Sequence, residues 1–321
     1  MKKAKDQIVV VGAGFAGTCA SQALVSLGFP VLLIDRRFRC PDLFRAEKIE
    51  GNQADLMREL GVLEHRAPRR SPIGLIRSFD ARDGSEVEVD AGEQYGIDYG
   101  PTVNRLIETL PAEVDRLTGR VVGFDLDRDY PSVELEGGET VEGRVVVLAT
   151  GGSKRLASAA GLTRRRKEDL RSLSFGFDVV RTDGGPFPFS GFNYTLGPNP
   201  ALLDYITFFP IGDRMRVNLF SQLRAGNPLV SELRADMEGT LARYFPELSS
   251  RVGAFRVAGN VKAAPTVFSR LHRPWARRIV AIGDEHQTVS PTTGTGLSRA
   301  LTDVAVLRRH ARSWPPGVPV N

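Results

Sequence analysis

The sequence is poor in the residues from which disulfide frameworks, metal sites and membrane anchors are built. Of its 321 residues only two are cysteine and four are histidine, and no histidine stands near cysteines or acids at the spacing of metal ligands. Cys19 falls within a predicted buried helix, so we expect free thiols and a reducing, cytoplasmic environment. No apolar run approaches the roughly 20 residues that a membrane-spanning helix requires. The sequence therefore predicts neither a metal site nor a transmembrane segment.

Low-complexity tracts, internal repeats and GxSxG nucleophile motifs are also missing. The composition, 41% hydrophobic and 25% charged, is that of an ordinary globular protein, and 321 residues suffice for two domains. The formal charge is +5, but the densest basic cluster, residues 164–167, has no interleaved aromatic residues and is expected to be solvated surface. We therefore expect no nucleic-acid partner, although a positive field can concentrate anionic ligands near a cleft.

The chain opens with a pattern that is typical of a dinucleotide-binding unit. Residues 7–11 form a short β-branched apolar run, as in a strand buried on both faces, and the run leads into the motif GAGFAG at 12–17. In this motif Gly12 permits the tight turn, Gly14 leaves room for a pyrophosphate, and Gly17 lets the following helix pack against the strand. The N-terminus of that helix would direct unpaired N–H groups at the phosphates.

A second strand ends in an acid about 20 residues further on. Residues 31–34 precede Asp35, whose carboxylate would accept hydrogen bonds from ribose hydroxyls, and Arg36 and Arg37 follow it. Strand, glycine motif, helix, strand and terminal acid arrive in order, which indicates dinucleotide binding much more strongly than the glycine motif alone. The opening unit by itself does not distinguish FAD from NAD.

Another glycine-rich segment stands near the C-terminus. Residues 278–282 have the pattern of a strand, and it runs into GDEHQTVSPTTGTGLSRALTDVAVL at 283–307, which ends with helical periodicity. A carboxylate at a strand end, here Asp284, can hold the hydroxyls of a ribityl chain, and glycines before a helix let backbone N–H groups approach a ring. In the alternative interpretation Asp284 is an ordinary loop acid and the glycines only form turns.

This segment resembles the GD motif of the FAD-dependent aromatic hydroxylases, the class A flavoprotein monooxygenases similar to para-hydroxybenzoate hydroxylase. In that superfamily a Gly-Asp pair, a later proline and two closely spaced glycines surround the flavin. The residues that match by position are Gly283, Asp284, Pro291, Gly294 and Gly296. The family often has a histidine where this chain has Gln287, and His286 lies one position earlier, so no catalytic side chain is assigned.

Further stretches extend the resemblance over the whole chain. Residues 43–63 resemble the region in which an arginine reaches the cofactor, and Arg45 is the matching residue, with a solvated loop arginine as the alternative. Residues 119–125 and 145–149 resemble two strands of the FAD fold, and Val122 aligns with backbone that meets the adenine. The resemblance implies FAD as the cofactor, held by Gly12, Gly14, Phe15, Ala16, Gly17, Asp35, Arg36, Arg37, Arg45, Val122, Thr150, Gly151, Gly152, Gly283, Asp284, Pro291, Gly294, Thr295, Gly296 and Leu297.

Two positions depart from the family pattern. Pro101 falls where many relatives have Gln or Arg, so a contact to the flavin is expected to be lost. At 149–156 the chain reads ATGGSKRL, where the hydroxylases usually have an Asp-Gly pair that serves both FAD and the pyridine nucleotide. The resemblance therefore leaves two electron donors open, NAD(P)H bound directly or a separate flavin reductase.

The middle of the chain predicts an antiparallel sheet. Residues 173–181 alternate as a half-buried strand, and 205–221 have the pattern of a hairpin that turns at Gly212 and Asp213. The hairpin resembles the substrate domain of the hydroxylases, in which aromatic and polar side chains shape the pocket. The candidate pocket residues are Phe177, Tyr205, Thr207, Phe208 and Phe209. Because side chains alternate along a strand, Tyr205 and Thr207 face one side and Phe208 the other, and the pattern does not tell which side is open.

A helix is predicted after this hairpin. Ser231 is the expected N-cap, and four apolar residues follow near helical spacing. The stripe, which is expected to be core, consists of Leu233, Met237, Leu241 and Phe245.

Together the patterns predict an α/β fold, with a Rossmann-type FAD-binding domain on a parallel sheet and a smaller antiparallel-sheet substrate domain. The FAD-binding domain is expected to be discontinuous, comprising 1–74, 95–165 and 265–321, and the substrate domain comprises 75–94 and 166–264. The resemblance implies a monooxygenase that hydroxylates or epoxidises a small aromatic molecule with molecular oxygen through a flavin hydroperoxide. The alternatives are a geranylgeranyl-reductase-like reductase of C=C bonds, a two-component monooxygenase supplied by a separate reductase, and an FAD-binding sensor.

Overall fold

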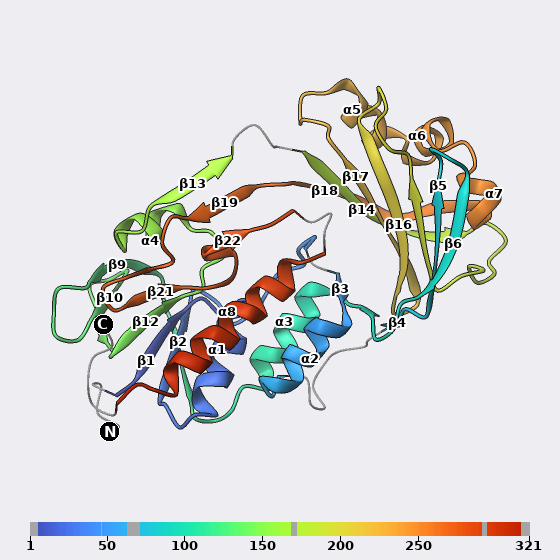
Figure 1. Cartoon of the computed structure of the whole chain (residues 1–321). Coiled ribbons are helices and arrows are strands. Elements are labelled where there is room, and N and C mark those ends of the chain that lie inside the picture. The colour runs from blue at the N-terminus through green and yellow to red at the C-terminus, as the bar shows by residue number, and fades with distance from the viewer. Residues whose placement is uncertain (1–5, 46, 63–70, 168–171, 291–293, 316–321) are drawn as a thin grey trace.

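Two lobes make up the molecule, and long strands join them (Figure 1). The computed structural model describes residues 6–45, 47–62, 71–167, 172–290 and 294–315, and of residues 166 and 167 only the backbone. The first lobe contains the six-stranded sheet β20-β21-β12-β1-β2-β8, and the second lobe contains the seven-stranded sheet β18-β14-β17-β16-β15-β5-β6. The predicted fold class, a parallel Rossmann-type sheet beside an antiparallel one, is confirmed. None of the described helices is long and apolar enough to cross a membrane.

The central strands of the first sheet are buried on both faces. β1 (Ile8–Val11) consists of four buried apolar residues and pairs in parallel with β2 (Val31–Asp35) and β12 (Val145–Leu148). The sheet is completed by the parallel strands β8 (Val114–Thr118) and β21 (Ile279–Ala281) and by the short antiparallel strand β20 (Trp275–Ala276). Because the carboxyl ends of parallel strands meet at one edge, the turns that follow β1, β12 and β21 lie together there.

Alternation along β1 separates two cores. Ile8 and Val10 pack under four helices that lie side by side in Figure 1, whereas Val9 and Val11 pack against the other face. The helices are α1 (Phe15–Val25), α2 (Gly51–Glu59), α3 (Tyr99–Glu108) and α8 (Gly296–Ala311). The other face carries α4 (Lys154–Ala159) and the antiparallel meander β9 (Val121–Asp125), β10 (Ser132–Leu135) and β11 (Thr140–Glu142).

The second sheet has one face covered by helices and one face turned to the first lobe. Its strands are β5 (Leu75–Asp80), β6 (Ser85–Asp90), β14 (Leu173–Arg181), β15 (Gly191–Thr195), β16 (Leu203–Ile211), β17 (Arg214–Ser221) and β18 (Phe255–Pro265). The helices α5 (Pro228–Ala235), α6 (Met237–Tyr244) and α7 (Leu248–Val252) lie at the end far from the first lobe (Figure 1). Phe175, Phe177 and Phe208 belong to the core beneath them.

The single helix predicted from Ser231 is wrong, although its four apolar residues are buried as expected. The chain leaves the helical conformation at Asp236, with φ −146° and ψ 85°, and begins again as α6. The Asp236 carboxylate accepts a hydrogen bond of 2.9 Å from the N–H of Gly239, and Asn227 caps α5 in the same way. An acid that caps the next helix thus ends the first, which hydrophobic spacing alone does not reveal.

Two small sheets connect the lobes. One consists of β3 (Lys48–Ile49), β7 (Tyr95–Gly96) and β4 (Ser71–Pro72). The other consists of β13 (Arg164–Lys167), β19 (Phe268–Leu271) and β22 (Gln287–Thr288), and the short 3-10 helix η1 (Gly283–Glu285) precedes β22.

Candidate functional site

The glycine loop after β1 is packed tightly at two positions and is open at one. Gly12 has φ +109°, and a Cβ there would lie 2.5 Å from the carbonyl oxygen of Ala149. A Cβ on Gly17 would lie 1.9 Å from the carbonyl oxygen of Gly12. Gly14, by contrast, is extended, and a Cβ there would meet nothing within 4 Å. The free space at the loop therefore lies in front of Gly14.

The N-terminus of α1 opens onto that space without a side-chain cap. Its N-cap residue, Gly14, has no side chain that could accept a hydrogen bond, and its first turn contains no acid. The first N–H groups of a helix lack intrahelical partners, so this end suits an anion. Asp35 closes the loop from the other side, since its carboxylate accepts 2.7 Å from the N–H of Ala13 and 3.0 Å from that of Arg37. The side chains of Arg36 and Arg37 are exposed beyond the strand.

The GD segment lies directly on the first turn of α1. Gly283 has φ +63°, and a Cβ there would come within 2.8 Å of the Ala16 methyl group. The Asp284 carboxylate forms an ion pair of 2.6 Å with Arg45, 239 positions away in the chain. Tyr99 lies beside this pair, and burial raises its pKa to about 12. Two residues singled out separately in the sequence, Arg45 and Asp284, thus meet in one cluster.

The glycines that precede α8 are held by α2. A Cβ on Gly294 (φ +64°) would lie 3.3 Å from the Glu50 carboxylate. Gln53 donates hydrogen bonds to the Gly294 carbonyl at 3.2 Å and to Ser298 Oγ at 2.8 Å. Thr295 is the N-cap position of α8, whose first turn begins at Gly296 with no acid, and Leu297 is buried. Pro291 lies outside the described residues.

A buried carboxylate that the sequence analysis missed ties the turn after β12 to the GD segment. Glu285 is fully buried and accepts hydrogen bonds from the N–H groups of Gly152 at 3.0 Å and Ser153 at 2.9 Å, and from the Thr150 hydroxyl. It also forms an ion pair with Arg164, whose side chain is only 7% exposed. The prediction that residues 164–167 are solvated surface is therefore wrong for Arg164, because the Glu285 carboxylate draws it inward.

The remaining expected cofactor residues lie near the same turn. Gly151 and Gly152 both have positive φ, and a Cβ on Gly152 would lie 3.7 Å from the Asp284 carbonyl oxygen. Val122 is in β9, and its carbonyl accepts a hydrogen bond of 3.2 Å from Arg155. Next to Glu285, His286 Nδ1 lies 3.0 Å from Asp303, which also accepts 2.9 Å from the N–H of Gly283. His286 thus helps to fix the GD turn.

The face of the second sheet that is turned to the first lobe carries a row of polar residues. Strand register aligns them across six strands, and Asn193 donates 3.2 Å to Ser78 Oγ within the row. We call this set the polar row: Lys262, Gly176, Asn218, Thr207, Asn193 and Ser78. Asn218 Oδ1 is buried and has no hydrogen-bond partner among the described residues. An unsatisfied amide of this kind suits a ligand group.

Of the candidate pocket residues, Tyr205 and Thr207 lie on this open face, and Tyr205 stacks on Phe220 with ring centroids 4.5 Å apart. Phe208 is only 1% exposed, in the core under the helices, and Phe177 lies there too. Phe209 is buried against Ile73 and Ile211. Tyr205 and Thr207 therefore face the first lobe, whereas Phe177 and Phe208 face the helix-covered core, and the assignment of Tyr205 and Thr207 to a pocket stays a prediction.

One segment of the first lobe is pressed onto the open face. We call residues 41–45 and 47 the strap. The Phe44 ring occupies the place of a side chain on Gly176, since a Cβ there would lie 2.3 Å from it. Lys262 pairs with Asp42 at 2.6 Å, and Arg216 pairs with Glu47. Because Arg45 between them pairs with Asp284, the strap joins the nucleotide loops to the polar row.

A chain of ion pairs extends from the strap along β17. Arg216 and Glu47 are nearly buried, and Arg216 Nε donates 2.6 Å to Asp178. Arg214 bridges Asp178 at 2.8 Å and Asp98, the residue before α3, at 2.7 Å. Burial raises the pKa of Asp178, and the contact with Arg214 opposes that shift. These pairs fix the second sheet against the first lobe.

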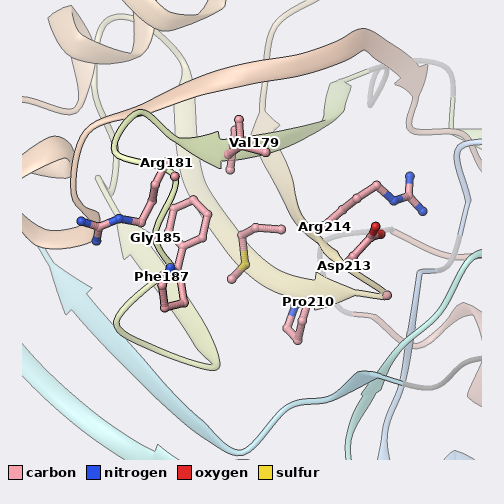
Figure 2. Close-up of a pocket in the computed structure, with 12 residues that line it drawn as sticks. Val179, Arg181, Gly185, Phe187, Pro210, Asp213 and Arg214 are labelled. Carbon is pink, nitrogen blue, oxygen red and sulfur yellow. The ribbon is translucent and has the colours of Figure 1, made fainter.

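A cavity of about 320 Å³ lies at the end of β14 and of the β16–β17 hairpin (Figure 2). Val179, Phe187 and Met215 line it, and all three pack with the helix-covered core. Figure 2 shows Arg214 extending away from Phe187, in keeping with its ion pair to Asp98. The cavity therefore opens at the edge of the core and not on the polar row.

The open space at Gly14, the uncapped α1, and the pair of Asp284 with Arg45 fit a dinucleotide cofactor bound along the edge of the first sheet. A family model described as an FAD binding domain matches residues 5–310. The chain belongs to this FAD-binding domain family. Its cofactor is accordingly FAD, the protein is an FAD-dependent oxidoreductase, and the resemblance to the aromatic hydroxylase superfamily is confirmed.

Relatives of this FAD-binding domain protein include both reductases and monooxygenases. Digeranylgeranylglycerophospholipid reductase 1 of Methanopyrus kandleri is 27% identical over 318 residues, covering 92% of this chain and 77% of the relative. The 6-hydroxynicotinate 3-monooxygenase of Bordetella bronchiseptica is 24% identical and covers 95% and 82%. The p-nitrophenol 4-monooxygenase structure from Pseudomonas putida superposes with a TM-score of 0.74 at 16% identity, over 95% of this chain and 78% of the other. The last similarity shows the shared fold.

Proposed function

We propose that the protein is a flavin-dependent monooxygenase acting on a small polar organic molecule held at the polar row. The observation that carries this proposal is the strap. Arg45 pairs with Asp284 of the GD segment, while Phe44 and Glu47 on either side of it contact Gly176 and Arg216 on the open face. A molecule on the open face would therefore lie beside the cofactor segment.

Different residues of the first lobe would bind different parts of FAD. Gly14 and the first turn of α1 would bind the pyrophosphate, and Asp35 would accept hydrogen bonds from the ribose. Arg45 and Asp284 would lie along the ribityl chain, and the N–H groups that open α8 would favour negative charge on the ring. The redox chemistry, including activation of dioxygen, is supplied by FAD when it is bound.

The residues of the second lobe would bind and orient the substrate. Asn218 and Thr207 lie opposite each other on neighbouring strands, and Asn218 Oδ1 has no hydrogen-bond partner among the described residues. Phe44 from the strap and the stacked rings of Tyr205 and Phe220 would restrict the access of water to this region. No described side chain is required to form a covalent bond with the substrate in this proposal.

A reductase of C=C bonds is the second candidate, because one relative is named digeranylgeranylglycerophospholipid reductase 1. The polar row argues against it. An isoprenoid chain lying on Asn218, Thr207 and Asn193 would leave their polar groups without water, at a cost of roughly 1–3 kcal/mol for each group.

The test uses FAD-loaded protein, reduced anaerobically and then exposed to ¹⁸O₂ with a panel of hydroxylated aromatic compounds. Incorporation of one ¹⁸O atom into product supports the monooxygenase. Saturation of a prenyl substrate under anaerobic conditions, with no oxygen incorporation in any reaction, would establish the reductase instead.

Separate reactions in that experiment identify the electron donor. Glu285 occupies the N–H groups of Gly152 and Ser153, at the place where the family has its Asp-Gly pair. We therefore include NADH, NADPH and a separate flavin reductase with NADH. Bleaching of the flavin absorbance by a nucleotide alone identifies a self-sufficient enzyme, and bleaching only with the reductase identifies a two-component one.

A further inference from the structure

We propose that the open face selects uncharged polar molecules and rejects anionic ones, and that Glu47 and Asp178 set this selection. The inference rests on the proposed function, because it concerns the molecule that this face holds. It runs against the simplest expectation from the sequence, in which a chain of formal charge +5 attracts anionic ligands.

Among the described residues, each basic group beside the centre of the polar row is already engaged by a carboxylate. Lys262, at one end of the row, pairs with Asp42 at 2.6 Å. Arg216, two residues from Asn218 on the same side of β17, holds Glu47 and also donates 2.6 Å to Asp178. A carboxylate on a ligand would have to displace one of these acids before it could reach a guanidinium or ammonium group.

The balance of charge around the row is negative. In the part of the chain that the structure describes, three cations, Lys262, Arg214 and Arg216, pair with four carboxylates. The acids are Asp42, Glu47, Asp98 and Asp178. Glu47 is nearly buried and its second oxygen has no partner among the described residues. A ligand anion placed near it would meet a like charge in a poorly solvated setting, which is a strong means of rejecting the wrong molecule.

The groups of the described residues that remain for a ligand are neutral. Asn218 Oδ1 has no partner among the described residues, Thr207 lies opposite Asn218 on the neighbouring strand, and an amide and a hydroxyl can each donate or accept a hydrogen bond. They suit an amide, a neutral hydroxyl or a ring N–H. Arg256 on the edge strand β18 is exposed, but it pairs with Val180. It therefore lies further along the sheet than Asp178 and away from Asn218.

The experiment compares matched probes that differ only in charge. Binding of 4-hydroxybenzamide and 4-hydroxybenzoate, and of 6-hydroxynicotinamide and 6-hydroxynicotinate, is measured by calorimetry with the FAD-loaded protein at neutral pH. We expect each amide to bind at least tenfold more tightly than its carboxylate. We also expect the affinity for the carboxylates to rise as KCl is added, since salt screens repulsion, whereas a free arginine would give the opposite trend.

Variants of Glu47 and Asp178 then test whether these two residues cause the preference for uncharged ligands. Glu47→Gln and Asp178→Asn should each reduce the preference for the amide at least threefold. Glu232→Gln removes the same charge from the exposed pair of Glu232 with Arg243 on the far helices and should leave the preference unchanged, as should Arg256→Gln. If a buried-pair variant fails to fold, the salt dependence of the wild-type protein still decides the matter.

Equal or tighter binding of the carboxylates by the wild-type protein overturns the inference, as does affinity for them that falls with salt. Failure of both members of both pairs to bind also overturns it, because the open face is then no site for such molecules. Because calorimetry needs no turnover, loss of oxygen incorporation with the amide preference intact would count against the proposed monooxygenase activity alone.

Discussion

Replacement of Gly14 by alanine should separate cofactor binding from folding. Gly14 is extended, with φ −75°, and a Cβ there meets nothing within 4 Å, so the apoprotein has room for the methyl group. Alanine is a poorer N-cap than glycine, but it also reduces the entropy of the unfolded chain by about 0.4–1 kcal/mol. The two effects oppose each other, and we expect the free energy of unfolding of apo Gly14→Ala to stay within about 1 kcal/mol of wild type.

We expect the substitution to weaken the binding of FAD instead. The added methyl group would stand where the pyrophosphate approaches the N–H groups of α1. Loss of one hydrogen bond to a charged group costs about 1.5–3 kcal/mol. That loss raises the Kd for FAD by a factor of roughly 10 to 150. Kd is measured by quenching of flavin fluorescence on addition of apoprotein, and stability by urea unfolding of the same preparation.

Gly17→Ala is the matched control, because its Cβ would lie 1.9 Å from the Gly12 carbonyl oxygen and should prevent native packing with or without FAD. The reasoning would be refuted by a folded Gly14→Ala protein that binds FAD within threefold of the wild-type affinity. It would equally be refuted by a Gly14→Ala apoprotein as unstable as the Gly17→Ala protein.

Three further predictions concern stability and thiol chemistry. Glu285→Ala leaves the Arg164 guanidinium buried without its carboxylate and should cost about 3–5 kcal/mol in urea unfolding, and a second change, Arg164→Leu, should recover part of that loss. Asp236→Ala should cost about 1 kcal/mol through loss of the α6 cap, whereas Asp236→Asn should cost much less. Burial raises the pKa of Cys19 from 9.0 to about 12, so a thiol reagent should label only Cys40 in native protein and both cysteines in denaturant. Because that pKa is raised on folding, its contribution to stability is present below pH 9 and should be lost as pH rises from 9 towards 12, a slope that Cys19→Ala should reduce.

The first lobe could be predicted from the sequence because its signals are local. Glycines at 12, 14 and 17, and an acid at the end of β2, are required by a single turn and its neighbouring strand. The GD segment was found in the same way. The contact of Arg45 with Asp284 follows once both are assigned to one cofactor, although 239 positions separate them.

Side-chain pairs that depend on tertiary packing could not be predicted. Glu285 looks like any acid after the GD pair, and nothing nearby in the sequence marks Arg164 as its partner. The same is true of Arg216 and Glu47, which meet only because the strap lies on the open face. Phe208 illustrates a different limit, since alternation defines two sides of a strand but only the position of the helices decides which side is core.

The order of strands in the first sheet has a consequence for synthesis of the protein. β1 is synthesised before the strands of the second sheet and β21 after them, yet both flank β12 in one sheet. Every strand of the second sheet, by contrast, has been made once residue 265 is complete. The nascent chain can therefore assemble the second sheet before β21 has been made, when the first sheet is still incomplete. Capture of FAD, which needs Gly14 and Asp284 together, must then follow the synthesis of the whole second sheet.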